Sequence, residues 1–110
     1  MKVAVIGSRG MHIENLGDYL PQNTEEIISG GAKGIDTDAR NFARLNNIPL
    51  VEFLPEYSKY KKGAPLKRNI QIAEYADIVI AFWDGKSKGT KFMIDYCNKK
   101  GIEIKAYELK

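Results

Sequence analysis

Three short glycine-containing segments hold the residues of this chain that are suited to binding a negatively charged group. The longest segment runs from residue 30 to residue 36 and has three glycines in its first five positions. Glycines let the backbone turn tightly and approach a ligand without obstruction by side chains. A helix that starts after such a turn directs free N–H groups and the positive end of its dipole at the same ligand. The segment therefore predicts a cradle for phosphate, and the alternative is a glycine turn that only packs a strand against a helix.

The predicted cradle combines main-chain donors with one charged side chain. Its members are Gly30, Gly31, Ala32, Lys33 and Gly34. Lys33 adds a mobile cation to the N–H groups. Asp36, two residues further on, leaves two interpretations open, because a carboxylate near a helix start can cap the helix or bind a ribose hydroxyl.

Two further segments can donate hydrogen bonds to the same kind of ligand. Gly7 is followed by Ser8, whose hydroxyl can donate to phosphate, and by Arg9, whose planar guanidinium suits bidentate contact with phosphate. The third segment, residues 85–90, ends in Gly89 and Thr90. Thr90 can cap a helix, or it can bind phosphate through its hydroxyl and N–H groups.

The positive charge of the chain is concentrated in one stretch. The 110 residues carry a net charge of +3, whereas residues 55–70 alone have five basic side chains against one acidic side chain, a net charge of +4. Such a run is either a solvated surface or a surface that faces an anion. Arg68 and Asn69 lie in this run, where a helix is predicted to begin and from which they could reach a ligand. Tyr57, Tyr60 and Trp83 lie in or beside these loops and could stack on a base.

Catalysis on a nucleotide would need a carboxylate beside the reacting carbon. Cleavage of an N-glycosidic bond is helped by a carboxylate that stabilises positive charge or activates water. Asp36 and Asp84 are the weak catalytic candidates at the predicted strand ends, and Glu56 is a more distant third.

Several classes of protein are disfavoured by what the sequence lacks. No segment fits the glycine patterns of dinucleotide-binding domains, P-loop nucleotide hydrolases or serine hydrolases. A single cysteine, Cys97, and a single histidine, His12, exclude a disulfide framework and a multi-histidine or multi-cysteine metal centre, so we expect neither a metal nor a cofactor. The apolar run at residues 3–6 is too short for a signal peptide or a membrane span. We therefore expect a cytoplasmic protein that does not contact a membrane.

Apolar runs and helical spacings alternate along the chain. The pattern predicts strands at residues 3–6, 27–29, 50–54, 78–82 and 102–107. Apolar residues at helical spacing predict helices over residues 13–20, 35–45, 66–76 and around 93–97. Strands that alternate with helices are typical of an α/β domain whose parallel sheet is built from right-handed crossovers. We therefore predict one domain over residues 1–110, a three-layer sandwich with strand order 3-2-1-4-5.

This order has a switch point between the first and fourth strands. Ligands of open α/β sheets bind outside the carboxyl ends of the strands near that point. Residues 7–10, 30–36 and 83–90, which hold the three glycine-containing segments, directly follow the first, second and fourth predicted strands. The fold therefore predicts that all three meet in one site.

Taken together, these motifs resemble the SLOG superfamily, which groups DNA-processing protein A (DprA) with the LOG phosphoribohydrolases. Residues 29–36, SGGAKGID, are similar to the S-G-G-A-x-G-I-D of DprA, and residues 65–72, PLKRNIQI, look like its F-P-x-R-N-R-I-I segment. Residues 7–9 look like the family's G-S-R, and residues 88–90 lie where the family has its second small-residue loop. The resemblance spans most of the chain, whose length suggests a small stand-alone member of the YspA-like kind. It implies a Rossmann-like fold, a homodimer, a pocket for a nucleotide or nucleotide-derived ligand, and a binding role for Arg68 and Asn69.

The sequence also departs from both groups. LOG enzymes carry P-G-G-x-G-T-x-x-E, and Met93 occupies the position of the essential glutamate. Gln71 stands where the DprA segment has its second arginine. We therefore predict a domain that binds a nucleotide-derived phosphate ligand as a sensor or processing domain. The alternatives are LOG-like hydrolysis of nucleotides and DprA-like binding of single-stranded DNA.

Overall fold

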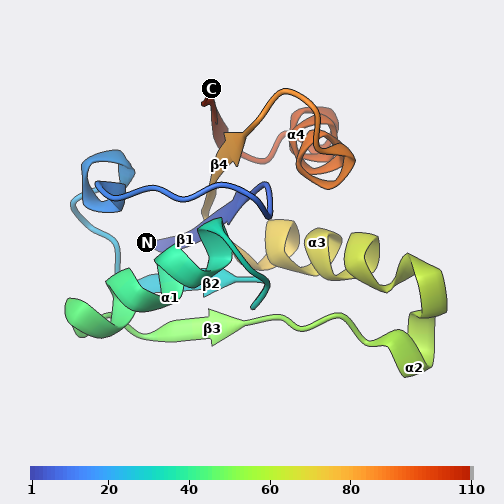
Figure 1. Ribbon diagram of the computed structural model, residues 1–110, viewed down its shortest axis with the longest axis horizontal. Helices are drawn as coiled ribbons and strands as arrows, with labels where there is room; N and C mark the ends of the chain where they lie inside the picture. The colour runs from blue at the N-terminus through green and yellow to red at the C-terminus, as the bar shows by residue number, and fades with distance from the viewer. Residues whose placement is uncertain (110) are drawn as a thin grey trace.

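A five-stranded parallel sheet forms the centre of the molecule, in a computed structural model that describes residues 1–109. Its strands are β1 (Lys2–Gly7), β2 (Glu26–Ser29), β3 (Leu50–Glu52), β4 (Ile78–Trp83) and β5 (Ile104–Glu108). They follow the order β3-β2-β1-β4-β5 (Figure 1). The predicted α/β class and strand order are confirmed.

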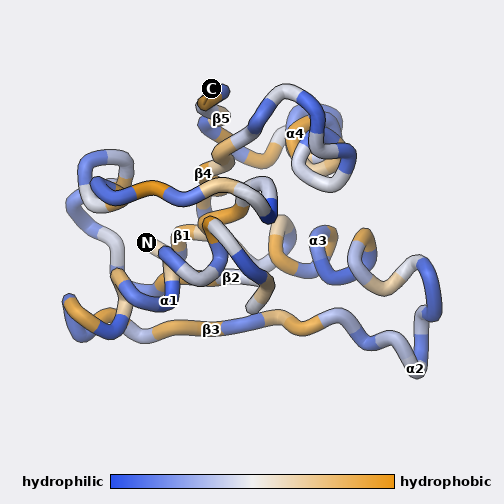
Figure 2. Tube along the Cα trace, viewed as in Figure 1, coloured by the Kyte–Doolittle hydropathy of each residue, from blue (hydrophilic) through white to orange (hydrophobic). Residues whose placement is uncertain are grey.

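Strands β1 and β4 are apolar apart from the exposed Lys2, which is typical of parallel strands whose two faces are both covered by helices. Successive side chains of a strand point to opposite faces. In β1, Val3 and Val5 join the core on one face of the sheet, and Ala4 and Ile6 join the core on the other. Figure 2 shows these strands in orange tones, in contrast to the blue tones around the turn at α2 (Tyr57–Tyr60).

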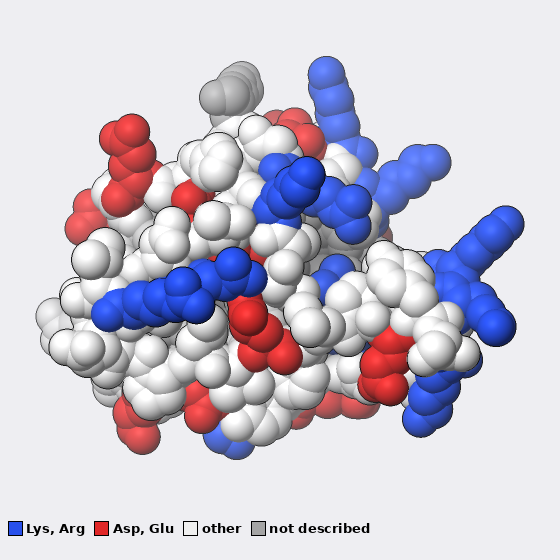
Figure 3. All heavy atoms as spheres, turned by 60° about the horizontal axis from the view of Figure 1, so that its bottom comes forward, with Lys and Arg blue, Asp and Glu red and all other residues white. Residues whose placement is uncertain are grey.

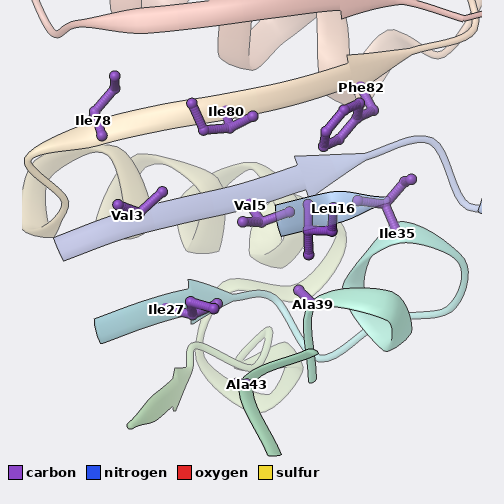
Figure 4. Packing of buried hydrophobic residues seen from close by; sticks show 10 residues of the cluster. All are labelled: Val3, Val5, Leu16, Ile27, Ile35, Ala39, Ala43, Ile78, Ile80 and Phe82. Atoms are coloured by element: carbon purple, nitrogen blue, oxygen red, sulfur yellow. The ribbon is translucent and has the colours of Figure 1, made fainter. Parts of the chain in front are cut away.

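The first core lies between the sheet and α1 (Ile35–Leu45), together with the short 3-10 helix η1 (Leu16–Tyr19). Ile35, Ala39 and Ala43 follow one another at intervals of four residues, so they line one face of α1 and point at the sheet (Figure 4). Phe82 of β4 closes this core toward the strand ends (Figure 4). Because Ile35 packs at the first turn of α1, this core fixes where the helix begins relative to β2.

The second core lies between the other face of the sheet and two helices, α3 (Ala64–Tyr75) and α4 (Lys88–Lys100). Ile72 and Ala73 come from α3, and Met93 and Cys97 come from α4. Gly101, with a φ of 73°, ends α4 in the left-handed conformation that glycine adopts without strain. Both helices therefore start at the edge of the sheet where the strands end, and both run back along the sheet.

One predicted helix is wrong. The spacing of Ile13, Leu16, Tyr19 and Leu20 predicted a helix over residues 13–20, but only Leu16–Tyr19 forms a single 3-10 turn. The main chain before this turn is not helical: Asn15 has a φ of −108° and a ψ of 46°, outside the helical region, and the N–H of Ile13 donates to the Asp38 carboxylate (2.7 Å). The four apolar side chains still pack on the first core, which explains their spacing.

The basic stretch holds two short elements that the sequence did not predict. These are α2 and the 3-10 helix η2 (Lys61–Gly63), which lead directly into α3. Neither buries a residue, so neither has the apolar periodicity that would reveal it. Among residues 1–109, we find no helix long and apolar enough to span a lipid bilayer.

Candidate functional site

A cleft of about 450 Å3 opens at the carboxyl ends of β1, β2 and β4. It lies at the switch point of the sheet, between the starts of α3 and α4. The residues that line it are Ile6, Gly7, Ser8, Arg9, Gly10, Gly30, Ala32, Asp36, Pro65, Leu66, Arg68, Asn69, Ile72, Asp84, Ser87, Gly89 and Thr90. The three segments that sequence reasoning singled out therefore meet in one place.

Eleven of the fourteen predicted site residues line this cleft. They are Gly7, Ser8, Arg9, Gly30, Ala32, Asp36, Arg68, Asn69, Asp84, Gly89 and Thr90. Gly31, Lys33 and Gly34 do not line it, and Lys33 is exposed to solvent. Sequence reasoning missed Ser87, which directly precedes the first residue of α4 and could have been recognised as an N-cap position.

Gly31 and Gly34 serve the packing of the loop rather than the cleft. Both have φ near +70°, which side chains rarely tolerate. A Cβ on Gly34 would collide with the main-chain carbonyl oxygen of Arg9, and a Cβ on Gly31 would lie 2.5 Å from Leu54. For these two positions the structure therefore matches the alternative of a glycine turn that packs a strand against its neighbours.

Gly30 makes a different kind of contact, because the guanidinium of Arg68 packs directly against it. Arg68 Nη1 donates to the carbonyl oxygen of Gly30 (2.7 Å), and the same nitrogen fills the space that a Cβ on Gly30 would need. The side chain of Arg68 is buried, and its residue comes from the second turn of α3, 38 positions away in the chain. This contact ties the end of β2 to α3.

The same arginine orients the neighbouring amide. Arg68 Nε donates to Asn69 Oδ1 (2.9 Å), which leaves the Asn69 NH2 group as a donor on a side chain that lines the cleft. A guanidinium has five N–H groups, and these two hydrogen bonds use two of them. Arg68 therefore keeps three N–H groups, and Asn69 keeps its NH2 group, as donors that these hydrogen bonds do not use.

Asp36 is buried in the wall of the cleft. Its Oδ2 accepts a hydrogen bond from the Ala32 N–H (3.1 Å), which closes the glycine loop back onto α1. Burial raises the pKa of Asp36, although the Ala32 N–H and the positive charge of Arg68 both lower it. The carboxylate thus organises the loop before α1 rather than capping the helix, whose N-cap residue, Gly34, receives no side-chain hydrogen bond, and it still lines the cleft.

Asp84 organises the loop after β4 in a more exposed position. Its Oδ1 accepts hydrogen bonds from the N–H groups of Lys86 (2.8 Å) and Ser87 (2.7 Å), and these bonds lower the pKa of Asp84. Its own N–H donates to the hydroxyl oxygen of the buried Ser8 (3.3 Å). Ser8 therefore joins the loops that follow β1 and β4.

The start of α4 opens directly onto the cleft. The first intrahelical bond runs from the Lys91 N–H to the Ser87 carbonyl oxygen, so the N–H groups of Lys88, Gly89 and Thr90 have no acceptor within the helix. Apart from its chain neighbours and the nearby backbone of α4 itself, no heavy atom lies within 4 Å of where a Cβ on Gly89 would be. This helix start therefore offers open main-chain donors and the positive end of its dipole.

Two positive side chains, Arg9 and Arg68, line the cleft. Of the two, Arg9 is exposed to solvent. Burial lowers the pKa of Arg68 most, and the charge of Arg9 lowers it further, so the two guanidinium groups repel each other. Figure 3 shows Lys and Arg side chains extending from the right of the molecule, the side toward which β2 and β3 point in Figure 1. An anion placed in the cleft would relieve this repulsion.

The aromatic residues proposed for base stacking do not line the cleft. Trp83 Nε1 donates to the Ser87 carbonyl oxygen (3.0 Å), which supports the loop before α4. The ring of Tyr60 lies beneath the ammonium groups of Lys59 and Lys67. Tyr57, at the start of α2, is 56% exposed.

Comparison with known proteins gives one informative likeness. No family model and no curated protein matches the sequence. Among solved structures, DNA processing protein A (DprA) from Streptococcus pneumoniae superimposes with a TM-score of 0.75 at 23% identity. The match covers 99% of this chain and 50% of that one, so this chain spans about half of the length of its structural neighbour. At this identity the match establishes the fold. The chain has the Rossmann-like α/β fold of DprA.

Proposed function

We propose that the cleft binds a nucleotide or nucleotide-derived ligand through a phosphate group, and that the domain senses or processes that ligand. One observation carries the proposal: donors from three separate elements converge on a single cleft at the switch point. They are the guanidinium of Arg9 after β1, the Arg68–Asn69 pair of α3, and the N–H groups at the start of α4. Such a set of donors suits an anion with several acceptor oxygens.

The size of the cleft supports a small organic ligand. Sites for small molecules have volumes of about 300–1,000 Å3, and this cleft has about 450 Å3. Ile6, Ile72 and Leu66 add apolar surface beside the donors, as a sugar or base would require. The resemblance of the glycine loop and of the Arg68–Asn69 segment to the SLOG superfamily points to the same class of ligand.

The proposal is tested by thermal-shift and calorimetric titration with nucleoside monophosphates, cyclic nucleotides and ADP-ribose. A ligand at about 100 times its Kd stabilises the folded protein by about 2.7 kcal/mol. We expect Arg9→Ala to weaken binding, because an exposed guanidinium is lost from the cleft. Arg44→Ala, which removes an exposed arginine at the far end of α1, is the matched control and leaves binding unchanged. A wild-type protein that responds to none of these compounds would contradict the proposal.

Hydrolysis of an N-glycosidic bond in the same cleft is the first alternative. The candidate carboxylates Asp36 and Asp84 line the cleft, but each already accepts main-chain hydrogen bonds. Glu56 does not line it. Chromatography after incubation with nucleoside monophosphates would detect a released base, and unchanged substrate at high enzyme concentration would remove this alternative.

Binding of single-stranded DNA is the second alternative, and the basic surface around α2 favours it. Lys61 and Lys62 are exposed there, close to the exposed ring of Tyr57, and the structural neighbour is named for DNA processing. Backbone charge and stacked aromatic rings are the usual means of holding single strands. An affinity for oligonucleotides that falls steeply with salt, and that the double variant Lys61→Ala/Lys62→Ala weakens, is the expected result.

We also propose that the protein forms a homodimer. Strands β3 and β5 stand at the two edges of the sheet formed by residues 1–109, so each has one side without a neighbouring strand. Light scattering coupled to size-exclusion chromatography measures the mass directly. A mass of one chain across all accessible concentrations would contradict this proposal.

A further inference from the structure

The ionisable side chains that line the cleft balance in charge. There are two of each sign: Arg9, Arg68, Asp36 and Asp84. The two carboxylates differ in how firmly they are placed. Asp84 is exposed at the rim, whereas Asp36 is buried in the wall and rigidly held by the loop. Any negative charge that enters the cleft must therefore approach a fixed carboxylate as well as the guanidinium groups.

Asp36 and Arg68 meet at the same glycine. A Cβ on Gly30 would lie 2.8 Å from Arg68 Cζ and 3.1 Å from Asp36 Oδ2, so both charged groups lie against the face that this glycine leaves open. Among the ion pairs of residues 1–109, the two groups form no direct bridge; each is held by a main-chain group, Arg68 by the Gly30 carbonyl and Asp36 by the Ala32 N–H. Their charges still interact, because each changes the pKa of the other.

The remaining charged and polar groups around Asp36 come from every neighbouring element. Glu52 of β3 raises its pKa by repulsion, but Arg40 of α1 holds Glu52 in an ion pair (2.8 Å). The Ser29 hydroxyl at the end of β2 lowers it, and Arg68 of α3 does the same. Among these neighbours, Arg68 is therefore the one cation of the cleft wall that lowers the pKa of Asp36. Asp36 is in turn the buried counter-charge of Arg68.

We propose that Asp36 selects the charge of the ligand: its carboxylate offsets one of the two guanidinium charges, so that the cleft binds a singly charged phosphodiester in preference to a doubly charged phosphomonoester. This inference rests on the proposed function and names the class of phosphate that the same site takes. Asp84 is exposed at the rim, where solvent screens its charge, so in the wall of the cleft Asp36 offsets Arg68 and the charge of Arg9 is left for a monoanion. A dianion carries a second negative charge. While Asp36 is ionised, it already neutralises one of the two guanidinium charges, so this second charge has no cation left to pair with.

Two nucleotides that differ in this one property provide the test. Adenosine 3′,5′-cyclic monophosphate is a monoanion, and adenosine 5′-monophosphate is a dianion at a pH of about 8, well above its second ionisation near about 6. Calorimetric titration of the wild type is expected to give the lower Kd for the cyclic nucleotide. In Asp36→Asn, which keeps an oxygen for the Ala32 N–H, the affinity for the 5′-monophosphate is expected to rise about tenfold relative to that for the cyclic nucleotide, the equivalent of about one pKa unit of interaction.

Asp38→Asn is the matched control. Asp38 lies on the same helix, and its substitution removes the same charge. Its carboxylate likewise accepts a hydrogen bond from a main-chain N–H, that of Ile13, but Asp38 does not line the cleft. We expect it to leave the ratio of the two affinities unchanged. An unchanged ratio in Asp36→Asn, or an equal change in both variants, would overturn the charge selection while the proposed function stands. Failure of the wild type to bind either nucleotide would overturn the proposed function itself.

A measurement on the wild type alone covers the case in which Asp36→Asn does not fold. Inorganic sulfate remains a dianion throughout mildly acidic and neutral pH, so any change in its affinity with pH comes from ionisation of the protein. Because protonation removes the negative charge of Asp36, the affinity for sulfate is expected to rise as pH falls toward the raised pKa of this carboxyl. The Asp38→Asn variant is expected to show the same rise, and a sulfate affinity that does not increase as pH falls would contradict the proposal.

Discussion

The loop after β2 and the loop after β4 have similar compositions but opposite constructions. The first comprises residues 30–36 and the second residues 84–90, so that each includes the start of the following helix and contains glycines and one aspartate. In the first, Asp36 is buried, Gly34 packs against main chain, and Arg68 reaches in from α3. In the second, Asp84 is exposed, and nothing lies near the open side of Gly89.

This difference shows that a glycine-rich segment after a strand can either form the packed wall of a site or leave main-chain N–H groups open to a ligand. The β2 loop is crowded because β1, β3 and α3 all approach it, so its glycines make room for neighbours. The β4 loop is held by hydrogen bonds within its own seven residues and by Ser8, so its glycine leaves the start of α4 accessible. The predictions below test this contrast, beginning with the largest expected effect.

Gly34→Ala is expected to destabilise the fold most. The added Cβ meets the carbonyl oxygen of Arg9, which is main chain and cannot move aside, and the φ of 72° is itself unfavourable for alanine. We expect a loss of about 3 kcal/mol or more in the free energy of unfolding. Urea denaturation measures it. A loss below about 1 kcal/mol would mean that the two loops do not differ as described.

Arg68→Met keeps much of the apolar length of the side chain and removes its charge. The Gly30 carbonyl loses its charged donor and buried Asp36 loses its counter-charge, so we expect a loss of about 2 kcal/mol. The ligand-induced thermal shift is expected to disappear as well. Arg40→Met, which removes a half-buried guanidinium from the ion pair with Glu52 outside the cleft, is the control and should keep the ligand response.

Gly89→Ala is expected to change stability in the opposite direction to Gly34→Ala. Gly89 lies in the first turn of α4 with open space where the Cβ would go, so alanine lowers the entropy of the unfolded chain at no steric cost. We expect a gain of about 0.5 kcal/mol or slightly more. Thermal and urea unfolding measure it, and a clear destabilisation would show that the start of α4 is not open.

The two aspartates are expected to give the smallest effects and opposite dependences on pH. The pKa of Asp84 is lowered in the folded state, so its stabilising contribution is present above pH 3.8 and is lost as pH falls through the lowered pKa. The pKa of Asp36 is raised, so its contribution is full below pH 3.8 and is lost as pH rises through the raised pKa. Asp84→Asn should therefore cost stability near neutral pH and little in acid.

Asp36→Asn should show the reverse trend relative to the wild type, becoming more favourable as pH rises from acid to neutral. Urea unfolding at a series of pH values compares both variants with the wild type. Parallel pH profiles for the two variants would contradict the contrast between a buried and an exposed carboxylate.

Much of the architecture could be predicted because it follows from local chemistry. The apolar runs at β1 and β4, the helical spacing of Ile35 and Ala39, and the stop at Gly101 each report a backbone preference that a few neighbouring residues determine. The helix over residues 13–20 failed for the opposite reason. Its spacing was real, because the four side chains pack on the first core, but the backbone at Asn15 lies outside the helical region and only one 3-10 turn forms.

From the sequence alone it followed that three glycine-containing loops and a basic helix start would gather at one end of a parallel sheet, because strand order and strand direction place them there. Only the tertiary structure decided which of their groups face the ligand. Gly34 packs against the Arg9 carbonyl, and Arg68 lies on Gly30 opposite Asp36, through contacts between residues far apart in the chain. The physical reason is that a glycine signals space for a close approach, whereas the identity of what approaches is determined by the packing of the other elements.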